Sequence, residues 1–219
     1  MRKIGEGRIA DRFFLSMHTQ LGSVNRHILI TTAAVFWLRN KKKIDTRTLT
    51  VAAFCTDAMF VLFLVEIPIA GGVHIRLAPC IGILVGPAIG TCVVLIVNIF
   101  TAAIKHGGWS MIGANVLVNV IEVFVAWVLY AGLKNAIRTL FPRVALATFV
   151  SLCIGNCAMI AIIRVSGVQG VTQTQEQVLY GLTQIAAVNL AVAVIESIVT
   201  GFMVAFIERT RPDILGKKP

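Results

Sequence analysis

Residues 77–104, LAPCIGILVGPAIGTCVVLIVNIFTAAI, form an apolar run of 28 residues without a charged side chain. A membrane-spanning helix needs about 20 such residues, so the run is long for one span and short for two. Gly86-Pro87 divides it, and this dipeptide combines a residue that tolerates non-helical angles with one that removes a helical hydrogen bond. The number of membrane crossings therefore depends on whether the chain turns at Gly86-Pro87.

The composition places the chain in a membrane. Of its 219 residues, 57% are hydrophobic and 14% are charged, and the mean hydropathy is +0.85. Soluble domains hold about 45–50% apolar and about 25% charged residues. The net charge of +10 comes from residues between the apolar runs, which indicates membrane topology and not nucleic-acid binding. The start of the chain, residues 1–16, lacks the features of a secretory signal.

Four of the remaining apolar runs have the length of membrane segments, and the first, residues 28–38, approaches it if extended back through residues 21–26. The remaining runs cover residues 28–38, 48–66, 111–133, 144–165 and 182–207. We therefore expect one membrane-embedded domain over residues 1–219, with a polar outer segment (1–27), a helical bundle (28–207) and a cytoplasmic tail (208–219).

The distribution of basic residues among the connections indicates whether the chain turns at Gly86-Pro87. Residues 39–47, 134–143 and 209–218 carry five, three and four Lys or Arg, respectively. A single span over 77–104 would put the first of these connections across the membrane from the other two, whereas a turn puts all three on one side. Because basic loops stay in the cytoplasm, the turn is favoured. The sequence predicts an all-α polytopic protein of about seven segments, the third short or broken, with the N-terminus outside and the C-terminus inside.

This topology brings histidines together on the outer face. His18, His74 and His106 lie in outer connections, and His27 lies near the same face. Neutral imidazole is a common ligand of divalent transition metals, so a metal site is a hypothesis here. The five cysteines fall in or beside apolar runs and are expected to pack; Cys153 and Cys157 are one turn apart, but no second pair completes a thiolate site.

Three stretches carry a resemblance to a known family. They are HGGWSMIGAN (106–115), IPIAGGVH (67–74) followed by GILVGP (82–87), and ESIVTGFMVAFIERTRPDIL (196–215). In order and spacing they resemble the CbiM/NikM family, the substrate-binding membrane subunits of energy-coupling-factor (ECF) cobalt and nickel ABC transporters. The resemblance implies a seven-helix protein of the plasma membrane that captures Co²⁺ or Ni²⁺ from outside.

The resemblance also implies partners. They are a transmembrane coupling subunit, a pair of cytoplasmic ATPases and often a small accessory membrane subunit. The chain has no phosphate-binding loop, so we expect ATP hydrolysis in the partners and no catalysis here. No cofactor is expected, because the metal is the transported ligand. In the family the metal is held by the terminal amine, by the amide and imidazole of a histidine at position two, and by a loop histidine that His74 matches.

The N-terminus departs from the family pattern, and two alignments remain open. In one, Met17-His18 is the true start, which restores the amine and histidine ligands. In the other, IADRFFLS (9–16) corresponds to the family's opening motif, and Arg8 stands where that histidine belongs. Because a guanidinium cannot ligate a metal cation, the second alignment implies a divergent site.

Further polar residues are candidates for the mouth of the site. Asn115 could support a ligand histidine, as could His106, while Glu66 is expected near His74. Arg76 would repel a divalent ion unless paired, for instance with Glu66. For Glu122 and Glu196, inside apolar runs, helix-to-helix hydrogen bonds to an Asn or a backbone group are favoured over proton coupling.

Two other functions compete with metal capture. A divergent relative could import another metal or a small organic solute, with Arg76 meeting an anionic group. An intramembrane enzyme would need a Ser or Cys nucleophile beside a histidine, or a His-Glu-x-x-His helix. The second motif is absent, and no Ser/His pair shares a helix face.

Overall fold

The computed structural model describes residues 46–64, 66–67, 73–104, 112–166 and 175–211. They form five long helices and a pair of two-residue strands. The elements are α2 (Thr46–Leu64), β1 (Glu66–Ile67), β2 (Val73–His74), α3 (Ala78–Ala103), α4 (Ile112–Gly132), α5 (Leu140–Ser166) and α6 (Gln175–Thr210). All five helices are long and apolar enough to cross a membrane. The prediction of a helical, multi-pass membrane protein is confirmed for the part of the chain described; the predicted segment 28–38 lies outside it.

The helices follow the predicted runs but extend beyond two of them. α6 begins at Gln175 and ends at Thr210, whereas the apolar run covers 182–207 only. α5 likewise begins at Leu140, four residues before its apolar run. The hydrogen bonds of a helix join backbone groups and do not require apolar side chains. A helix can therefore continue into polar sequence beyond the hydrocarbon core of the membrane. The first three residues of the predicted cytoplasmic tail therefore belong to α6.

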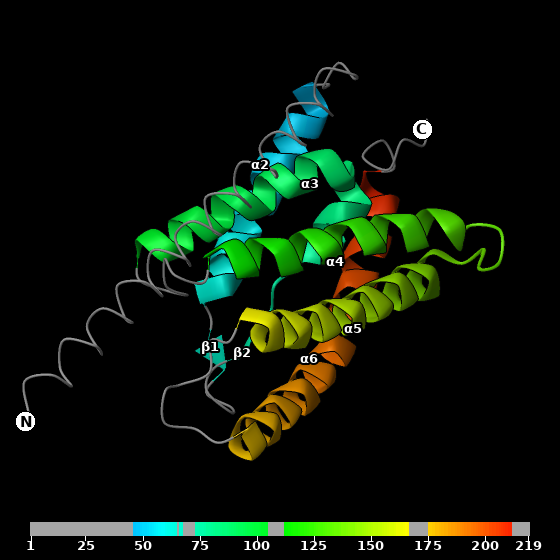
Figure 1. The fold of residues 1–219 in the computed structure, drawn as a ribbon. Coiled ribbons are helices and arrows are strands. Elements are labelled where there is room, and N and C mark those ends of the chain that lie inside the picture. The colour runs from blue at the N-terminus through cyan, green and yellow to red at the C-terminus, as the bar shows by residue number, and fades with distance from the viewer. Residues whose placement is uncertain (1–45, 65, 68–72, 105–111, 167–174, 212–219) are drawn as a thin grey trace, which may run out of the picture.

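The helices pack in chain order. α2 packs on α3, α3 on α4, α4 on α5 and α5 on α6. In Figure 1 the start of α2, the α4–α5 connection and the end of α6 gather at one end of the bundle, and the strands and the end of α5 lie toward the other. These three ends belong to the three basic connections, as the charge argument requires. The count of seven segments and the side on which each terminus lies remain predictions.

The helical run of α3 is broken at Gly86. This residue has φ 80° and ψ 173°, and Pro87 follows it. The break divides α3 into a short first part and a longer second part, and in Figure 1 the ribbon of α3 changes direction within its length. Thr91, in the turn after the break, donates its hydroxyl hydrogen to the Pro87 carbonyl at 2.7 Å. The predicted break at Gly86-Pro87 is confirmed.

The two parts of α3 lie close against α4. A Cβ atom at Gly82 would collide with the backbone carbonyl of Val123, and one at Gly90 would collide with the Val123 side chain. Small residues allow the two helix backbones to come close together. Helices in a membrane associate through such close packing, because the hydrophobic effect does not drive their association in lipid. Val94 and Val123 are fully buried beside these contacts. The contact holds the first part of α3, and the strand before it, against the centre of the bundle.

This packing makes Gly82 sensitive to a single methyl group. We expect Gly82→Ala to destabilise the protein by at least the roughly 1–3 kcal/mol typical of overpacking, because the obstacle is backbone. Thermal unfolding of the purified protein, followed by circular dichroism, should show a lower midpoint, by about 2–4 °C per kcal/mol. Gly181→Ala is the control, since a Cβ there meets no atom within 4 Å. Equal midpoints for the two variants would contradict the close contact.

Candidate metal-capture site

His74 lies on a short hairpin between α2 and α3. In the antiparallel pair of β1 and β2, Glu66 is directly opposite His74, and Ile67 is opposite Val73. The His74 ring stacks on Phe63, near the end of α2, with centroids 4.9 Å apart and planes at 6°. Backbone pairing and ring stacking together restrict the orientation of the half-buried imidazole.

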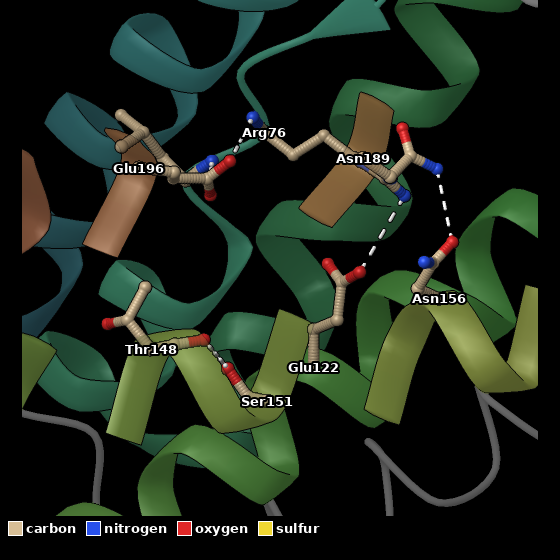
Figure 2. A network of polar contacts seen from close by, with 8 residues as sticks. Arg76, Glu122, Thr148, Ser151, Asn156, Asn189 and Glu196 are labelled. Carbon is tan, nitrogen blue, oxygen red and sulfur yellow. Dashed lines mark hydrogen bonds and ion pairs between the residues drawn. The ribbon is translucent and has the colours of Figure 1, made fainter. Parts of the chain in front are cut away.

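The chain after His74 is held by a carboxylate from a distant helix. Glu196 of α6 accepts hydrogen bonds from the backbone N–H of Leu77 (2.9 Å) and of Arg76 (3.3 Å). Figure 2 shows this carboxylate facing the segment between β2 and α3. Glu196 is 1% exposed, and its bond to the Leu77 amide is buried, whereas its bond to the Arg76 amide is partly buried. Hydrogen bonds to a charged acceptor contribute roughly 1.5–3 kcal/mol each, which makes Glu196 a strong clamp on the hairpin.

Leu77 explains why the clamp is needed. It has φ 52° and ψ 10°, the left-handed conformation, which is uncommon for any residue with a Cβ atom. Such a residue costs roughly 1–3 kcal/mol and persists only where its surroundings enforce it. Leu77 is buried, and its N–H is bound by Glu196. The sharp turn from β2 into α3 therefore depends on contacts with α6.

The Arg76 side chain points into the bundle. Its Nη1 lies 3.6 Å from Oε1 of Glu122 on α4, and the exposed fractions of the two side chains are 24% and 0%. The Glu122 carboxylate lies over Gly155 of α5, where a Cβ atom would collide with it. The structure shows Glu122 as the ion-pair partner of Arg76. The sequence suggested Glu66 as an example of such a partner. The expected Asn or backbone partner for Glu122 was wrong, but the backbone partner for Glu196 is confirmed.

A small polar cavity lies beneath His74. It has a volume of about 20 Å³, and its walls include His74, Arg76, Asn156, Asn189 and Glu196. Asn189 donates a side-chain hydrogen bond to Asn156 at 3.2 Å, which joins α6 to α5 (Figure 2). A cavity of this size has room for about one water molecule. The inner side of the histidine therefore adjoins polar groups of α5 and α6.

The other predicted site residues lie in several places. Asn115 is half-buried in the first turn of α4, as expected for the helix after the HGG turn. Met17, His18 and His106 lie outside the described residues. Within the described ranges, no three His, Cys, Asp or Glu side chains are close enough together to hold a metal ion. The structure thus shows how the His74 segment is held, and His74 is the one predicted ligand that it describes.

Comparisons with known sequences agree on one family, and a solved structure shares the fold. Residues 9–214 match the profile of a family described as CbiM, cobalt uptake substrate-specific transmembrane region. A CbiM 1 cobalt transport protein of Methanocorpusculum labreanum is 30% identical over 179 residues, covering 79% of this chain and 77% of that protein. The cobalt transport protein CbiM of Geobacter sulfurreducens is 30% identical over 140 residues, covering 62% of this chain and 39% of that protein. A crystal structure described as a truncated transition metal transporter has a similar fold, with a TM-score of 0.72 at 16% identity over 88% of this chain and 94% of the other.

The buried ion pair predicts a specific pattern of stability. Arg76→Met leaves the Glu122 carboxylate buried without its counter-charge, which should cost about 3–5 kcal/mol. Arg76→Met combined with Glu122→Leu removes both charges, so the double variant should be more stable than Arg76→Met alone. The measurement is the thermal midpoint of each purified variant.

Arg138→Met is the matched control, because Arg138 is exposed on the α4–α5 connection. A midpoint for Arg76→Met equal to that of Arg138→Met would contradict the pairing. So would a double variant less stable than either single variant.

Proposed function

Because the chain belongs to the CbiM family of cobalt uptake transmembrane proteins, we propose that it is the substrate-capturing subunit of an ECF-type importer for Co²⁺ or Ni²⁺. The metal would serve cobalamin or nickel-enzyme synthesis. The chain is a transport subunit, and ATP hydrolysis falls to partner chains. The observation that carries the proposal is His74, a histidine on a hairpin that the buried Glu196 carboxylate clamps to α6.

His74 suits the role of a metal ligand. Neutral imidazole binds borderline divalent metals, and ligands are most effective when neighbouring groups fix their orientation. Phe63 and the strand pairing with Glu66 supply that orientation here. The strands that carry His74 also lie at the end of the bundle away from the basic connections (Figure 1). Because the positive-inside rule assigns the basic connections to the cytoplasmic face, it assigns this opposite end to the outer face. A metal arriving from outside would meet this end first.

The family match bears on the remaining ligands. It begins at residue 9, ahead of Met17, and this supports the alignment in which residues 9–16 correspond to the family's opening motif. Under that alignment Arg8 replaces the expected histidine, and the metal is held by a set of ligands different from the amine and histidine chelate.

The chain's other histidines are His18, His27 and His106. If instead mature protein begins at Met17, His18 restores the chelate.

The pairing of Arg76 with Glu122 favours a cation over an anionic solute. An anion would need a guanidinium facing the mouth, but the Arg76 side chain lies against Glu122 inside the bundle. The same pairing offsets the repulsion that Arg76 would exert on a divalent ion at His74. Metal capture is therefore compatible with an arginine two residues from the ligand.

The proposed importer needs other chains. A transmembrane coupling subunit and a pair of cytoplasmic ATPases would supply energy, and a small accessory membrane subunit completes the assembly in many family members. The lipid bilayer is the remaining partner of this multi-pass protein. The importer would reside in the cytoplasmic membrane with the His74 hairpin outside.

Metal content of the intact protein tests the proposal. We expect protein purified from cells supplied with Co²⁺ or Ni²⁺ to hold near-stoichiometric metal, and His74→Ala to lose most of it. Intact-protein mass spectrometry, with elemental analysis alongside, measures both the metal and the mature N-terminus. Cys157→Ala removes an exposed thiol elsewhere and should leave the content unchanged. A metal-free wild type under these conditions would refute the proposal.

The Glu196 clamp predicts a further effect on affinity. Glu196→Leu keeps His74 but frees the backbone after it, and loss of such supporting contacts typically costs 10–100-fold in metal affinity. Competitive titration with a chromogenic chelator measures the change. Ser197→Ala is the control, because this buried hydroxyl bonds only the Val194 carbonyl within α6 among the described contacts. Equal affinities for the two variants would mean that Glu196 does not position His74.

A further inference from the structure

A second hollow lies at the opposite end of the bundle from His74. It is a groove of about 460 Å³ formed by α2, α3 and α6, and we call it the inner groove. Its walls include Phe54 and Ala58 of α2, Leu84 of α3 and Met203 of α6. The volume is within the range of about 300–1,000 Å³ typical of ligand sites. None of these residues belongs to the proposed metal site.

Two arginines stand at one end of the inner groove. Arg47 is the second residue of α2, and Arg211 directly follows α6. Figure 1 shows the start of α2 and the end of α6 at the same end of the bundle. These residues belong to two of the three basic connections, so the positive-inside rule puts both guanidinium groups at the cytoplasmic face. The groove is thus cationic at the membrane surface and apolar toward the membrane interior.

This polarity matches one class of ligand. We propose that the inner groove binds an anionic phospholipid of the cytoplasmic leaflet, with its phosphate between Arg47 and Arg211 and an acyl chain along Phe54, Ala58 and Met203. Guanidinium groups pair well with phosphate oxygens, and basic pockets between helices on the cytoplasmic side suit anionic headgroups. In the sequence, six further Lys or Arg lie near these two arginines: four in residues 39–43, before Arg47, and two at residues 217–218, after Arg211.

A partner's transmembrane helix fits the inner groove less well. Its apolar side chains would supply no negative charge for the two guanidinium groups. A phospholipid supplies the phosphate and the apolar chain in one molecule.

Both arginines also make contacts within the protein. Arg47 and Arg211 each make interactions of their own, as does Glu208, the acidic residue in the last turn of α6. A guanidinium carries five N–H donors in a planar fork, so one arginine can serve a protein group and a phosphate oxygen together. The proposal therefore requires only that both side chains remain at the end of the groove.

Native mass spectrometry of the full chain tests the proposal. The protein is released from vesicles containing equal amounts of phosphatidylglycerol and phosphatidylcholine with the same acyl chains, and bound lipid is counted. We expect phosphatidylglycerol to be retained in clear preference. Since a basic contact to an anionic headgroup is worth about fivefold in affinity, Arg47→Gln with Arg211→Gln should reduce that preference by up to about thirtyfold.

Matched variants separate a site from general surface charge. Lys134→Gln with Arg138→Gln removes the same charge from exposed positions at the same end of the bundle, and the preference should persist. Ala58→Trp keeps both arginines but fills the groove, and retention of phosphatidylglycerol should fall several-fold. Excess inorganic phosphate should not displace the lipid, because the acyl chain contributes to binding.

Three results would overturn the proposal. One is equal retention of the two lipids by the wild type, which would leave the groove to a protein partner. Another is an equal effect of the two double variants, which would mean nonspecific attraction. The third is displacement of the lipid by inorganic phosphate alone. Circular dichroism of each variant ensures that the compared proteins are folded.

Discussion

The rest of the site depends on one buried carboxylate. Glu196 of α6 accepts the N–H groups of Arg76 and Leu77, and these residues follow the strand that carries His74. The bonds join residues about 120 positions apart in the chain. Without them, the left-handed Leu77 would lose the contact that favours its conformation, and its buried amide would lack an acceptor. The position of the hairpin, and hence of the candidate ligand, follows from the position of α6.

Charge balance within the bundle reinforces this arrangement. Arg76 brings a guanidinium to Glu122 while its backbone binds Glu196, so one residue connects α4 and α6. Charges inside an apolar bundle are costly alone and tolerable in pairs, which restricts the segment after β2 to conformations that keep both contacts. Gly155 and Gly82 permit the close approach of α4 to α5 and α3 on which these pairings depend. Polar contacts and helix packing thus select the same geometry.

Sequence reasoning predicted part of this account. The membrane class and the helices followed from local hydropathy, and the break at Gly86 followed from local residue chemistry together with the distribution of basic residues among the connections. Glu122, Glu196, Asn156 and Asn189 were recognisable as polar residues in apolar runs. A backbone partner for Glu196 was also expected, but the segment that supplies it was not predicted, because sequence alone does not say which helix faces meet. Leu77 gave no signal, since a leucine rarely adopts its conformation. The inner groove was missed because it arises only when α2, α3 and α6 come together.

Glu196 is the residue that holds the backbone after His74. Hydrogen exchange of the Arg76 and Leu77 amides, measured in lipid nanodiscs for the wild type and for Glu196→Leu, tests this role most directly. We expect slow exchange in the wild type and at least about tenfold faster exchange in the variant, because breaking each charge-assisted bond lowers the protection by roughly 1.5–3 kcal/mol. Amides in the middle of α4 should keep their rates, which shows that the bundle remains folded. Unchanged exchange at both residues in a folded variant would contradict the account.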